Sequence, residues 1–471
     1  MDLFGRCETF GERSVEVGSA PVKVEVPGPA KLDDITVNPC LLPSSSKKLR
    51  VMICGTYPVG QSNGYSRVMY YIAKYLGQKP DITLTIYGFQ NFRQTTTSQR
   101  NDIPKNVILH DALATEDPKR SGFGDKEIAG YLKQHPQDIV VIFNDMVVTN
   151  MLVKDIVEKL SAEERKSFKL VSYMDQVYPH QRPEFIKMLN EHFDAVVAFT
   201  PYWKSVVRKL GLLESIPVYY FQHGFDNKLY YPMPKKLARL YYDLPLDAFI
   251  ILNLNRNQPR KRWDHCLMAY VRVIKKHLEF KTTQPKARPM RLMVGTMMNG
   301  FWDLMELFEA ELKRFDIPLE VGKEYLAVLE KPQQQTDRDI NILYNACDIG
   351  FNPCEGEGFG LCQFEHLAVG CPQVVANIGG FKEFIHKDNS SMVEPKWFYY
   401  VDKVRDGIGG YAEVSDPSDF AEAIWKYYLN PKLVANHGMR GREDILKGYK
   451  WDVLVDRFYQ NLLGIKARAW I

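Results

Sequence analysis

Short apolar runs alternate with segments of helical periodicity over most of this chain. The first run, LRVMICG at residues 49–55, has no helical period, which predicts a buried strand. A turn-rich stretch, TYPVGQSNG, and the helical segment SRVMYYIAKYLGQ follow it, and the order recurs through ITLTIYGF, NVILHDA, DIVVIFND, FKLVSYMD, FDAVVAFT and IPVYYFQHG. Buried strands that alternate with helices predict a parallel sheet covered on both faces.

A second series of the same kind begins at AFIILNLN and continues through RLMVGTM, LAVLEK, CDIGFNP and CPQVVAN. Residues 230–248 break the rhythm with three prolines, and we interpret them as a linker. We therefore predict an α/β fold of two doubly wound, Rossmann-like lobes. In such sheets, ligands bind outside the carboxyl ends of the strands, so the site is expected in a cleft between the lobes.

The predicted lobes span residues 49–240 and 241–449, and a tail precedes them. Residues 1–48 are poor in large apolar periodicity, and they include VPGPAKLDD and LLPSSSKK. We interpret this segment as a tail or arm.

The composition of the 471 residues is that of a globular protein, with 45% hydrophobic and 25% charged residues. The net charge of +4 is small and does not suggest a nucleic-acid partner. No apolar run approaches the roughly 18 residues that span a bilayer, and the N-terminus carries charges where a secretory signal needs an apolar core. We expect a cytoplasmic protein whose membrane contact is at most peripheral. Its eight cysteines lack C-x-x-C spacing and are expected to be reduced.

Two nucleotide-binding motifs are nearly but not fully present. Residues 55–62 resemble a Walker A loop, but Gln61 stands where the phosphate-binding lysine is required, which disfavours a P-loop nucleotidase. The pair Gly358 and Gly360 approaches the dinucleotide motif, but Gln363 occupies the last glycine position. A dinucleotide-dependent oxidoreductase is therefore disfavoured.

The sequence Asp337-Arg338-Asp339 has the D-x-D spacing that binds a metal in some sugar transferases. Thr336 precedes it, and a helical period follows, so Thr336 with Asp339 resembles a capping box. We interpret this motif as a helix start and predict no metal site.

The stretch CEGEGFGLCQFEHLAVG follows a predicted strand and opens a helix. Its glycines, Gly358 and Gly360, lie at the helix N-terminus, where bare backbone amides favour a phosphate. Glu357 precedes the helix and Glu365 lies inside it, about 10–12 Å apart if the segment were fully helical. That separation exceeds the ~5–9.5 Å of a glycosidase pair but suits two carboxylates at either end of a bound diphosphate, one accepting sugar hydroxyls and one ribose hydroxyls.

The loop NLNRNQPRKRWD follows another strand of the same lobe. It holds four cations within seven residues, which are Arg256, Arg260, Lys261 and Arg262. Charge-assisted bonds from such side chains would neutralise a leaving diphosphate.

Five segments in order resemble family 4 glycosyltransferases, the retaining enzymes with the GT-B fold. EGFGLCQFE is similar to the E-x7-E signature and RNQPRKR to the R-x(4)-K phosphate element. VMICGTYPVGQSNGYSRV resembles the N-lobe opening, QHGFDNKLYYP the segment before the linker, and GYKWDVLVDRFYQNLLG the final helix that crosses back to the N-lobe. The C-terminal helix, residues 450–471, is therefore assigned to the first lobe.

The resemblance implies donor binding in the second lobe and acceptor binding mainly in the first, without a cofactor or an obligatory metal. It implies that Glu357 contacts the donor sugar, Glu365 the ribose, and Arg256 with Lys261 the diphosphate. Backbone amides for the diphosphate are expected from Gly64, Gly358, Phe359, Gly360 and Leu361, and Gly379 with Gly380 is expected to flank the sugar.

The chain departs from the family at two places. Met174 precedes Asp175 where many members carry a histidine, so Asp175 is a candidate on the acceptor side. Arg262 replaces the glycine after the phosphate lysine, which adds either a charge or a clash.

The predicted function is transfer of a hexose from a UDP- or GDP-sugar to a hydroxyl of a glycan or glycolipid. The alternatives are a non-catalytic module that binds a sugar nucleotide or glycan, and a GT-B nucleotide-sugar epimerase. A phosphorylase would need a pyridoxal lysine, and no residue marks one.

Overall fold

A computed structural model describes residues 47–60, 63–92 and 100–468 of the chain. Contacts divide the chain into one unit of residues 1–44 and a second of residues 45–471, and everything described below belongs to the second. The tail predicted at residues 1–48 lies, up to residue 46, outside the described residues, as do Gln61, Cys7 and Cys40.

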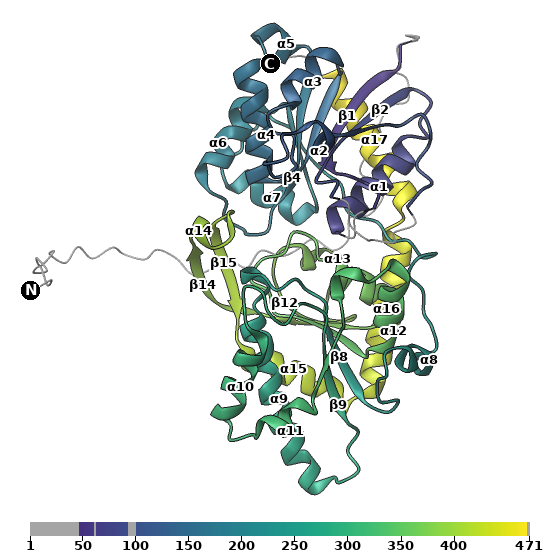
Figure 1. The fold of residues 1–471 in the computed structure, drawn as a ribbon, viewed down its shortest axis with the longest axis vertical. Coiled ribbons are helices and arrows are strands. Elements are labelled where there is room, and N and C mark those ends of the chain that lie inside the picture. The colour runs from purple at the N-terminus through teal and green to yellow at the C-terminus, as the bar shows by residue number, and fades with distance from the viewer. Residues whose placement is uncertain (1–46, 61–62, 93–99, 469–471) are drawn as a thin grey trace, which may run out of the picture. The chain divides into compact units, whose positions relative to one another are not determined.

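The first sheet has seven parallel strands in the order β3-β2-β1-β4-β5-β6-β7. Figure 1 labels β1, β2 and β4 of this sheet. The strands are β1 (Leu49–Thr56), β2 (Ile82–Phe89), β3 (Ile108–Asp111), β4 (Ile139–Asp145), β5 (Lys169–Asp175), β6 (Ala195–Ala198) and β7 (Val218–Tyr220). The helices of this part are α1 (Gly64–Leu76), α2 (Ala112–Thr115), α3 (Ile128–Gln134), α4 (Met146–Lys159), α5 (Ala162–Lys166), α6 (Pro183–His192) and α7 (Pro201–Lys209). We call this part the N-terminal lobe.

The second sheet has six parallel strands in the order β10-β9-β8-β11-β12-β13, and we call its surroundings the C-terminal lobe. Its strands are β8 (Phe249–Asn253), β9 (Met290–Val294), β10 (Leu326–Val328), β11 (Ile349–Asn352), β12 (Gln373–Ala376) and β13 (Ser391–Val393). Its helices are α9 (Trp263–Thr283), α10 (Leu304–Arg314), α11 (Leu319–Lys323), α12 (Asp337–Ala346), α13 (Leu361–Ala368), α15 (Pro417–Leu429) and α16 (Pro431–Gly448), with 3-10 turns η1 (Pro259–Lys261), η2 (Pro332–Gln334) and η3 (Gly379–Glu383).

The predicted fold class, two doubly wound lobes, is confirmed. Strand order reverses between β1 and β4 in the first sheet and between β8 and β11 in the second. At such a switch point the loops that leave two neighbouring strands diverge and open a binding position. The loop after β8 carries Lys261 and the loop after β11 carries Glu357, so the topology brings these two predicted residues to one place.

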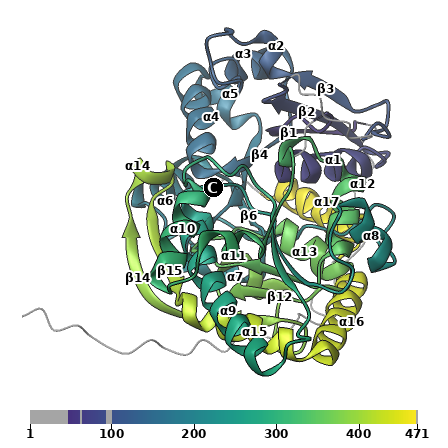
Figure 2. The same cartoon turned by 60° about the horizontal axis from the view of Figure 1, so that its bottom comes forward.

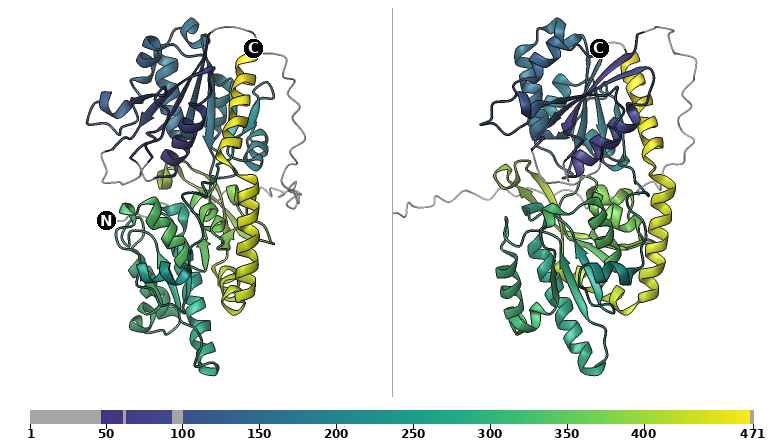
Figure 3. Two further views of the ribbon diagram at one scale, coloured as in Figure 1. Left: turned by 90° about the vertical axis from the view of Figure 1, so that its right-hand side faces the viewer. Right: turned by 45° about the vertical axis from the view of Figure 1, so that its right-hand side comes forward.

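Two segments join the lobes. The helix α17 (Trp451–Ala467) packs beside α1, which Figure 3 shows along the yellow end of the chain. The stretch interpreted as a linker contains a short helix, α8 (Lys235–Tyr241), which packs on α12. There Arg239 donates to Asp348 at 2.7 Å.

An antiparallel hairpin of β14 (Pro395–Val401) and β15 (Gly410–Ser415) lies apart from both sheets, with the short helix α14 (Lys403–Asp406) between its strands (Figure 2). The sequence did not lead us to predict it. One face packs Val401 and Ala412 on Val177 and Tyr178, which follow β5. Among the described residues, no helix is both long enough and apolar enough to cross a bilayer.

Candidate functional site

Lys261 and Glu357 form a buried ion pair at the switch point of the second sheet. The ammonium of Lys261 bonds the Oε2 atom of Glu357, and each residue is 8% exposed. Burial opposes ionisation of Glu357, but Lys261 and Arg260 outweigh burial and hold the pKa of its carboxyl below the usual value. A cationic side chain that can donate hydrogen bonds to phosphate and an anionic side chain that can accept them from sugar hydroxyls therefore lie side by side. A diphosphate sugar presents both kinds of group.

Arg256 does not join this pair. It is exposed, and its side chain makes no hydrogen bond or ion pair to another described residue. Only its backbone is held, because the Trp263 indole donates to the Arg256 carbonyl at 3.2 Å. The predicted role of Arg256 on a diphosphate stays a prediction.

The glycine turn before α13 lies against the N-terminal lobe. A Cβ atom on Gly358 would lie 2.0 Å from Oδ1 of Asp175, so only glycine fits there. The Trp203 indole, from α7, donates to the Gly358 carbonyl at 2.7 Å. The turn is therefore held from two elements of the other lobe.

The rest of the turn depends on close backbone approach. Gly360 caps α13 with φ +92°, a left-handed conformation that glycine adopts without strain. The Gly380 amide donates to the Glu357 carbonyl at 2.9 Å, and a Cβ on Gly380 would lie 2.2 Å from the Gly358 carbonyl oxygen. The Phe359 ring packs 4.6 Å from the ring of His223, a buried histidine whose two ring nitrogens lack described partners.

Gly64 brings the first loop of the N-terminal lobe to the same turn. It begins α1, and Asn63 caps that helix by accepting the Ser66 amide at 2.9 Å. A Cβ on Gly64 would lie 3.0 Å from the Leu361 side chain at the start of α13. The N-terminus of α1 therefore lies against the N-terminus of α13. Both were predicted to offer backbone amides to a diphosphate.

Asp175 ends β5 and faces this junction. The Tyr65 phenol donates to its Oδ2 atom, while Oδ1 has no hydrogen-bond partner among the described residues. Burial, with the charges of Asp145 and Glu357, raises the pKa of Asp175 to about 6 against the opposing effects of Tyr65 and Arg260. A buried carboxylate with a free oxygen can accept a substrate hydroxyl.

Glu365 lies on α13 and is bonded from both lobes. Arg67 of α1 pairs with its Oε1 atom, and the Tyr344 phenol donates to Oε2 at 3.0 Å. Burial raises the pKa of Glu365, and Arg67 opposes that shift. Arg67 also pairs with Asp337 at 2.8 Å. The carboxylate predicted to hold a ribose is thus held here by an arginine of the N-terminal lobe.

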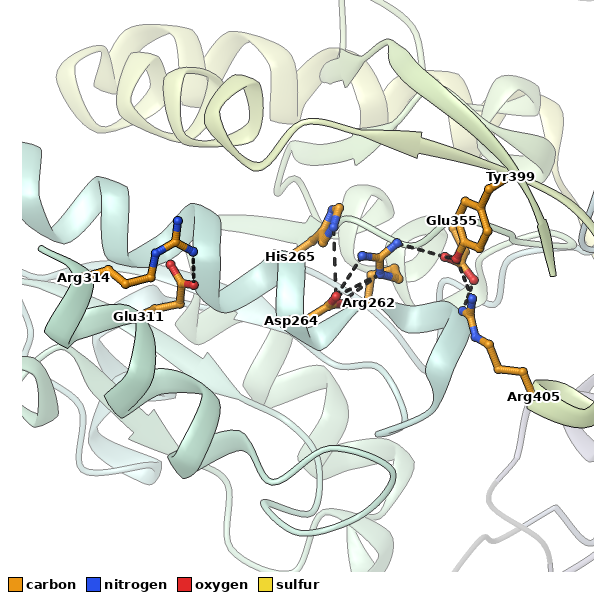
Figure 4. Close-up of polar contacts among 8 residues, drawn as sticks. All are labelled: Arg262, Asp264, His265, Glu311, Arg314, Glu355, Tyr399 and Arg405. Carbon is orange, nitrogen blue, oxygen red and sulfur yellow. Dashed lines mark hydrogen bonds and ion pairs between the residues drawn. The ribbon is translucent and has the colours of Figure 1, made fainter. Parts of the chain in front are cut away.

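Arg262, the departure from the family glycine, produces no clash. It adopts the left-handed conformation with φ 49°. Its guanidinium bonds both oxygens of Asp264, the closest at 2.8 Å, and reaches Glu355 at 3.1 Å (Figure 4). The Glu355 side chain is fully buried and also bonds Tyr399 and Arg405 of the β14–β15 hairpin region. Arg262 therefore helps to fasten the hairpin to the Glu357 loop.

The capping-box interpretation of Thr336 and Asp339 is confirmed. The Thr336 hydroxyl accepts the Asp339 amide at 3.1 Å, and the Asp339 carboxylate accepts the Thr336 amide at 3.0 Å. No group of three or more histidine, cysteine or acidic side chains within the described ranges is placed to hold a metal ion.

The sequence did not point us to Arg67 or Tyr65. A signal was available, because both residues lie in the first turn of a helix whose following residues are mostly apolar. A charged residue on a helix that packs on a sheet requires a partner, but its identity depends on the other lobe.

A family model described as Glycosyl transferases group 1 matches residues 325–430, which include Glu357, Glu365 and Gly380. A D-inositol 3-phosphate glycosyltransferase of Saccharomonospora viridis is 23% identical over 250 residues, 52% of this chain and 51% of that protein. The alpha-1,3/1,6-mannosyltransferase ALG2 of Mus musculus is 25% identical over 174 residues, 34% of this chain and 36% of the relative. The chain spans about half the length, or less, of these curated relatives.

Solved structures share the fold. Sucrose-phosphate synthase from Thermosynechococcus elongatus superposes with a TM-score of 0.63 at 15% identity, covering 88% of this chain and 100% of that one. Anabaena HepE in complex with UDP and glucose gives a TM-score of 0.63 at 15% identity, with the same coverage.

Proposed function

Because the chain belongs to the family 4 glycosyltransferases with the GT-B fold, we propose that it transfers a hexose from a nucleotide sugar to a hydroxyl acceptor. The donor is a UDP- or GDP-sugar and the acceptor a glycan or glycolipid. The single observation that carries the proposal is the buried Lys261–Glu357 pair at the Gly358 turn, which faces Asp175 of the other lobe. The similarity to relatives named as a glycosyltransferase and a mannosyltransferase, and the UDP bound to HepE, support it.

Each part of the donor has a partner in this site. The diphosphate is bound by Lys261 and by the amides at the start of α13, where the helix dipole favours negative charge. Glu357 accepts hydroxyls of the sugar. Glu365 accepts hydroxyls of the ribose, which requires it to exchange part of its bonding to Arg67.

The chemistry is a substitution at the sugar's anomeric carbon with retention. The bond from that carbon to the phosphate oxygen breaks, and a bond to the acceptor oxygen forms on the same face. The acceptor proton goes to the departing phosphate oxygen. Lys261 stabilises the charge that develops on the diphosphate, and Asp175 accepts the hydrogen bond that orients the acceptor hydroxyl.

Transfer is tested by incubating the full chain with UDP- and GDP-sugars, with and without candidate acceptors, and measuring free nucleoside diphosphate and product. Retention is read from the anomeric configuration of the product by NMR. Lys261→Ala is expected to lower kcat by ~10²–10³, the usual cost of losing a preorganised charge contact. Lys313→Ala on α10, which removes an exposed lysine paired with Glu309, is the matched control.

Each outcome discriminates between functions. Conversion of the donor without an acceptor indicates an epimerase. Donor binding without turnover indicates a non-catalytic module, and it is detected as stabilisation of about 2.7 kcal/mol at 100 times the donor Kd. A chain that neither binds nor converts any nucleotide sugar refutes the proposal.

A further inference from the structure

Arg260 is fixed on the short turn that also presents Lys261. Its carbonyl oxygen accepts the Glu355 amide at 3.0 Å, which ties the η1 turn to the loop after β11. Its Nη1 atom lies 3.5 Å from the Gly356 carbonyl oxygen. The Arg260 side chain therefore runs along the turn that leads to Glu357 and Gly358.

This position places the Arg260 guanidinium at the boundary with the N-terminal lobe. Gly358, two residues beyond Gly356, is in contact with Asp175 at the end of β5. Burial disfavours the charge on Arg260, but the carboxylates of Glu357 and Asp175 outweigh burial and raise its pKa. The charge on Arg260 is thus stabilised by one carboxylate from each lobe.

The neighbouring cations of the same loop are engaged elsewhere. Lys261 pairs with Glu357. Arg262 turns to Asp264 and Glu355. Arg256 is exposed and without a side-chain partner among the described residues. Within this loop, Arg260 is the cation that faces the carboxylate on the acceptor side.

The charged and titratable groups around Asp175 come from several elements, including Tyr173 of β5 itself. Tyr65 of α1 donates to it, Asp145 ends the neighbouring β4, and Glu357 belongs to the loop after β11. The carboxylates of Asp145 and Glu357 repel its charge, whereas Tyr65 and Arg260 stabilise it. Arg260 is the one cation of this set.

We propose that Arg260 is a positioning residue of the transfer reaction, which acts through Asp175. From the η1 turn after β8 it keeps the Asp175 carboxylate ionised and directed at the Gly358 turn, where the acceptor hydroxyl must meet the sugar. The inference rests on the proposed function. The inference goes beyond the proposed function because it assigns a cation to the acceptor side of the site. The C-terminal lobe supplies that cation, so the acceptor is oriented only when the lobes are in contact.

The test is the pH profile of kcat/KM for the acceptor, measured on the full chain at saturating donor. The wild-type profile is expected to lose activity as pH falls through about 6, because protonation removes the Asp175 charge. Arg260 lowers the pKa of Asp175, so Arg260→Met should move this acidic limb to higher pH. It should also raise the acceptor KM more than the donor KM.

Two variants separate charge from structure. Arg260→Lys keeps the charge and is expected to keep the acidic limb close to the wild-type position. Arg314→Met on α10 makes the same chemical change at an exposed arginine paired with Glu311, outside the site, and is expected to leave the limb in place. The proposal is overturned if Arg260→Met leaves both the limb and the acceptor KM unchanged, or if Arg260→Lys shifts the limb as far as Arg260→Met does.

A second readout does not require activity. If the wild-type chain transfers no sugar, the proposed function fails, but the charge coupling remains measurable by unfolding. The effect of Arg260→Met on the pH dependence of the unfolding free energy should disappear in an Asp175→Asn background, as a double-mutant cycle reports. Additive effects of the two substitutions would overturn the coupling itself.

Discussion

Substituting Gly358 by alanine tests the contact between the lobes directly. The added Cβ would lie 2.0 Å from Oδ1 of Asp175. A carbon and an oxygen in contact need about 3.3 Å, so the two groups must separate by about 1.3 Å. Neither the Asp175 carboxylate nor the Gly358 backbone can move easily. The Tyr65 phenol bonds the other Asp175 oxygen, and the Trp203 indole bonds the Gly358 carbonyl.

The expected cost has two parts. Overpacking of this kind destabilises a folded chain by about 1–3 kcal/mol, which is read from the urea midpoint. A displacement of about 1 Å at a reacting centre lowers turnover by ~10², which is read from kcat of the transfer assay. In an Asp175→Ala background the obstructing oxygen is gone, so Gly358→Ala should add little further loss of stability.

Gly130→Ala is the matched control, because a Cβ on that α3 glycine meets nothing within 4 Å. It should be neutral or stabilise by up to about 1 kcal/mol. If Gly358→Ala leaves the midpoint and the turnover of the chain unchanged, the turn and Asp175 are not in contact in solution, and the assembly of the site across the lobes is refuted.

Three further outcomes are expected. Glu355→Gln leaves Arg262 and Arg405 without their shared buried carboxylate and should lower the unfolding free energy by about 3 kcal/mol in a urea titration. Thr336→Ala removes one half of the α12 capping box and should cost about 1 kcal/mol by the same measurement. The raised pKa of Asp175, about 6 against an ordinary 3.9, means that the folded chain keeps a proton which the unfolded chain releases. Its contribution to stability should therefore fall as pH rises from about 4 to about 6, and the unfolding free energy of wild type minus that of Asp175→Asn should fall over this window.

Specific results would contradict these expectations. A Glu355→Gln variant as stable as wild type would mean that the hairpin is not fastened through this carboxylate. An unchanged urea midpoint for Thr336→Ala would show that the cap does not contribute to the unfolding free energy. A difference between wild type and Asp175→Asn that stays flat from pH 4 to 6 would show that Asp175 is solvated rather than buried.

Local features were predictable because they depend on residues close in sequence. The capping box of Thr336 and Asp339 needs a hydroxyl and a carboxylate three residues apart, and both bonds form. The glycine turn before α13 follows from Gly358 and Gly360 at the start of a helical period. Parallel strands and their covering helices follow from the alternation of buried runs and periodic segments.

The hairpin of β14 and β15 shows where local pattern was insufficient. The run KWFYYV has the apolar character of a buried strand, yet Phe398 is 66% exposed and Tyr400 54% exposed. Periodicity cannot separate a strand inside a sheet from a strand at a surface, because the neighbouring strand and not the run itself determines burial.

By itself, the sequence determined the two lobes, the glycine turn and the loops that carry Lys261 and Glu357. Only the tertiary structure decided that Tyr65 bonds Asp175, 110 residues away, and that Arg67 bonds Glu365, 298 residues away. It also decided that Arg260 rather than Arg256 turns inward. The physical reason is that periodicity and caps record interactions within a few residues, whereas the partner of a buried charge is set by how the two sheets pack on each other.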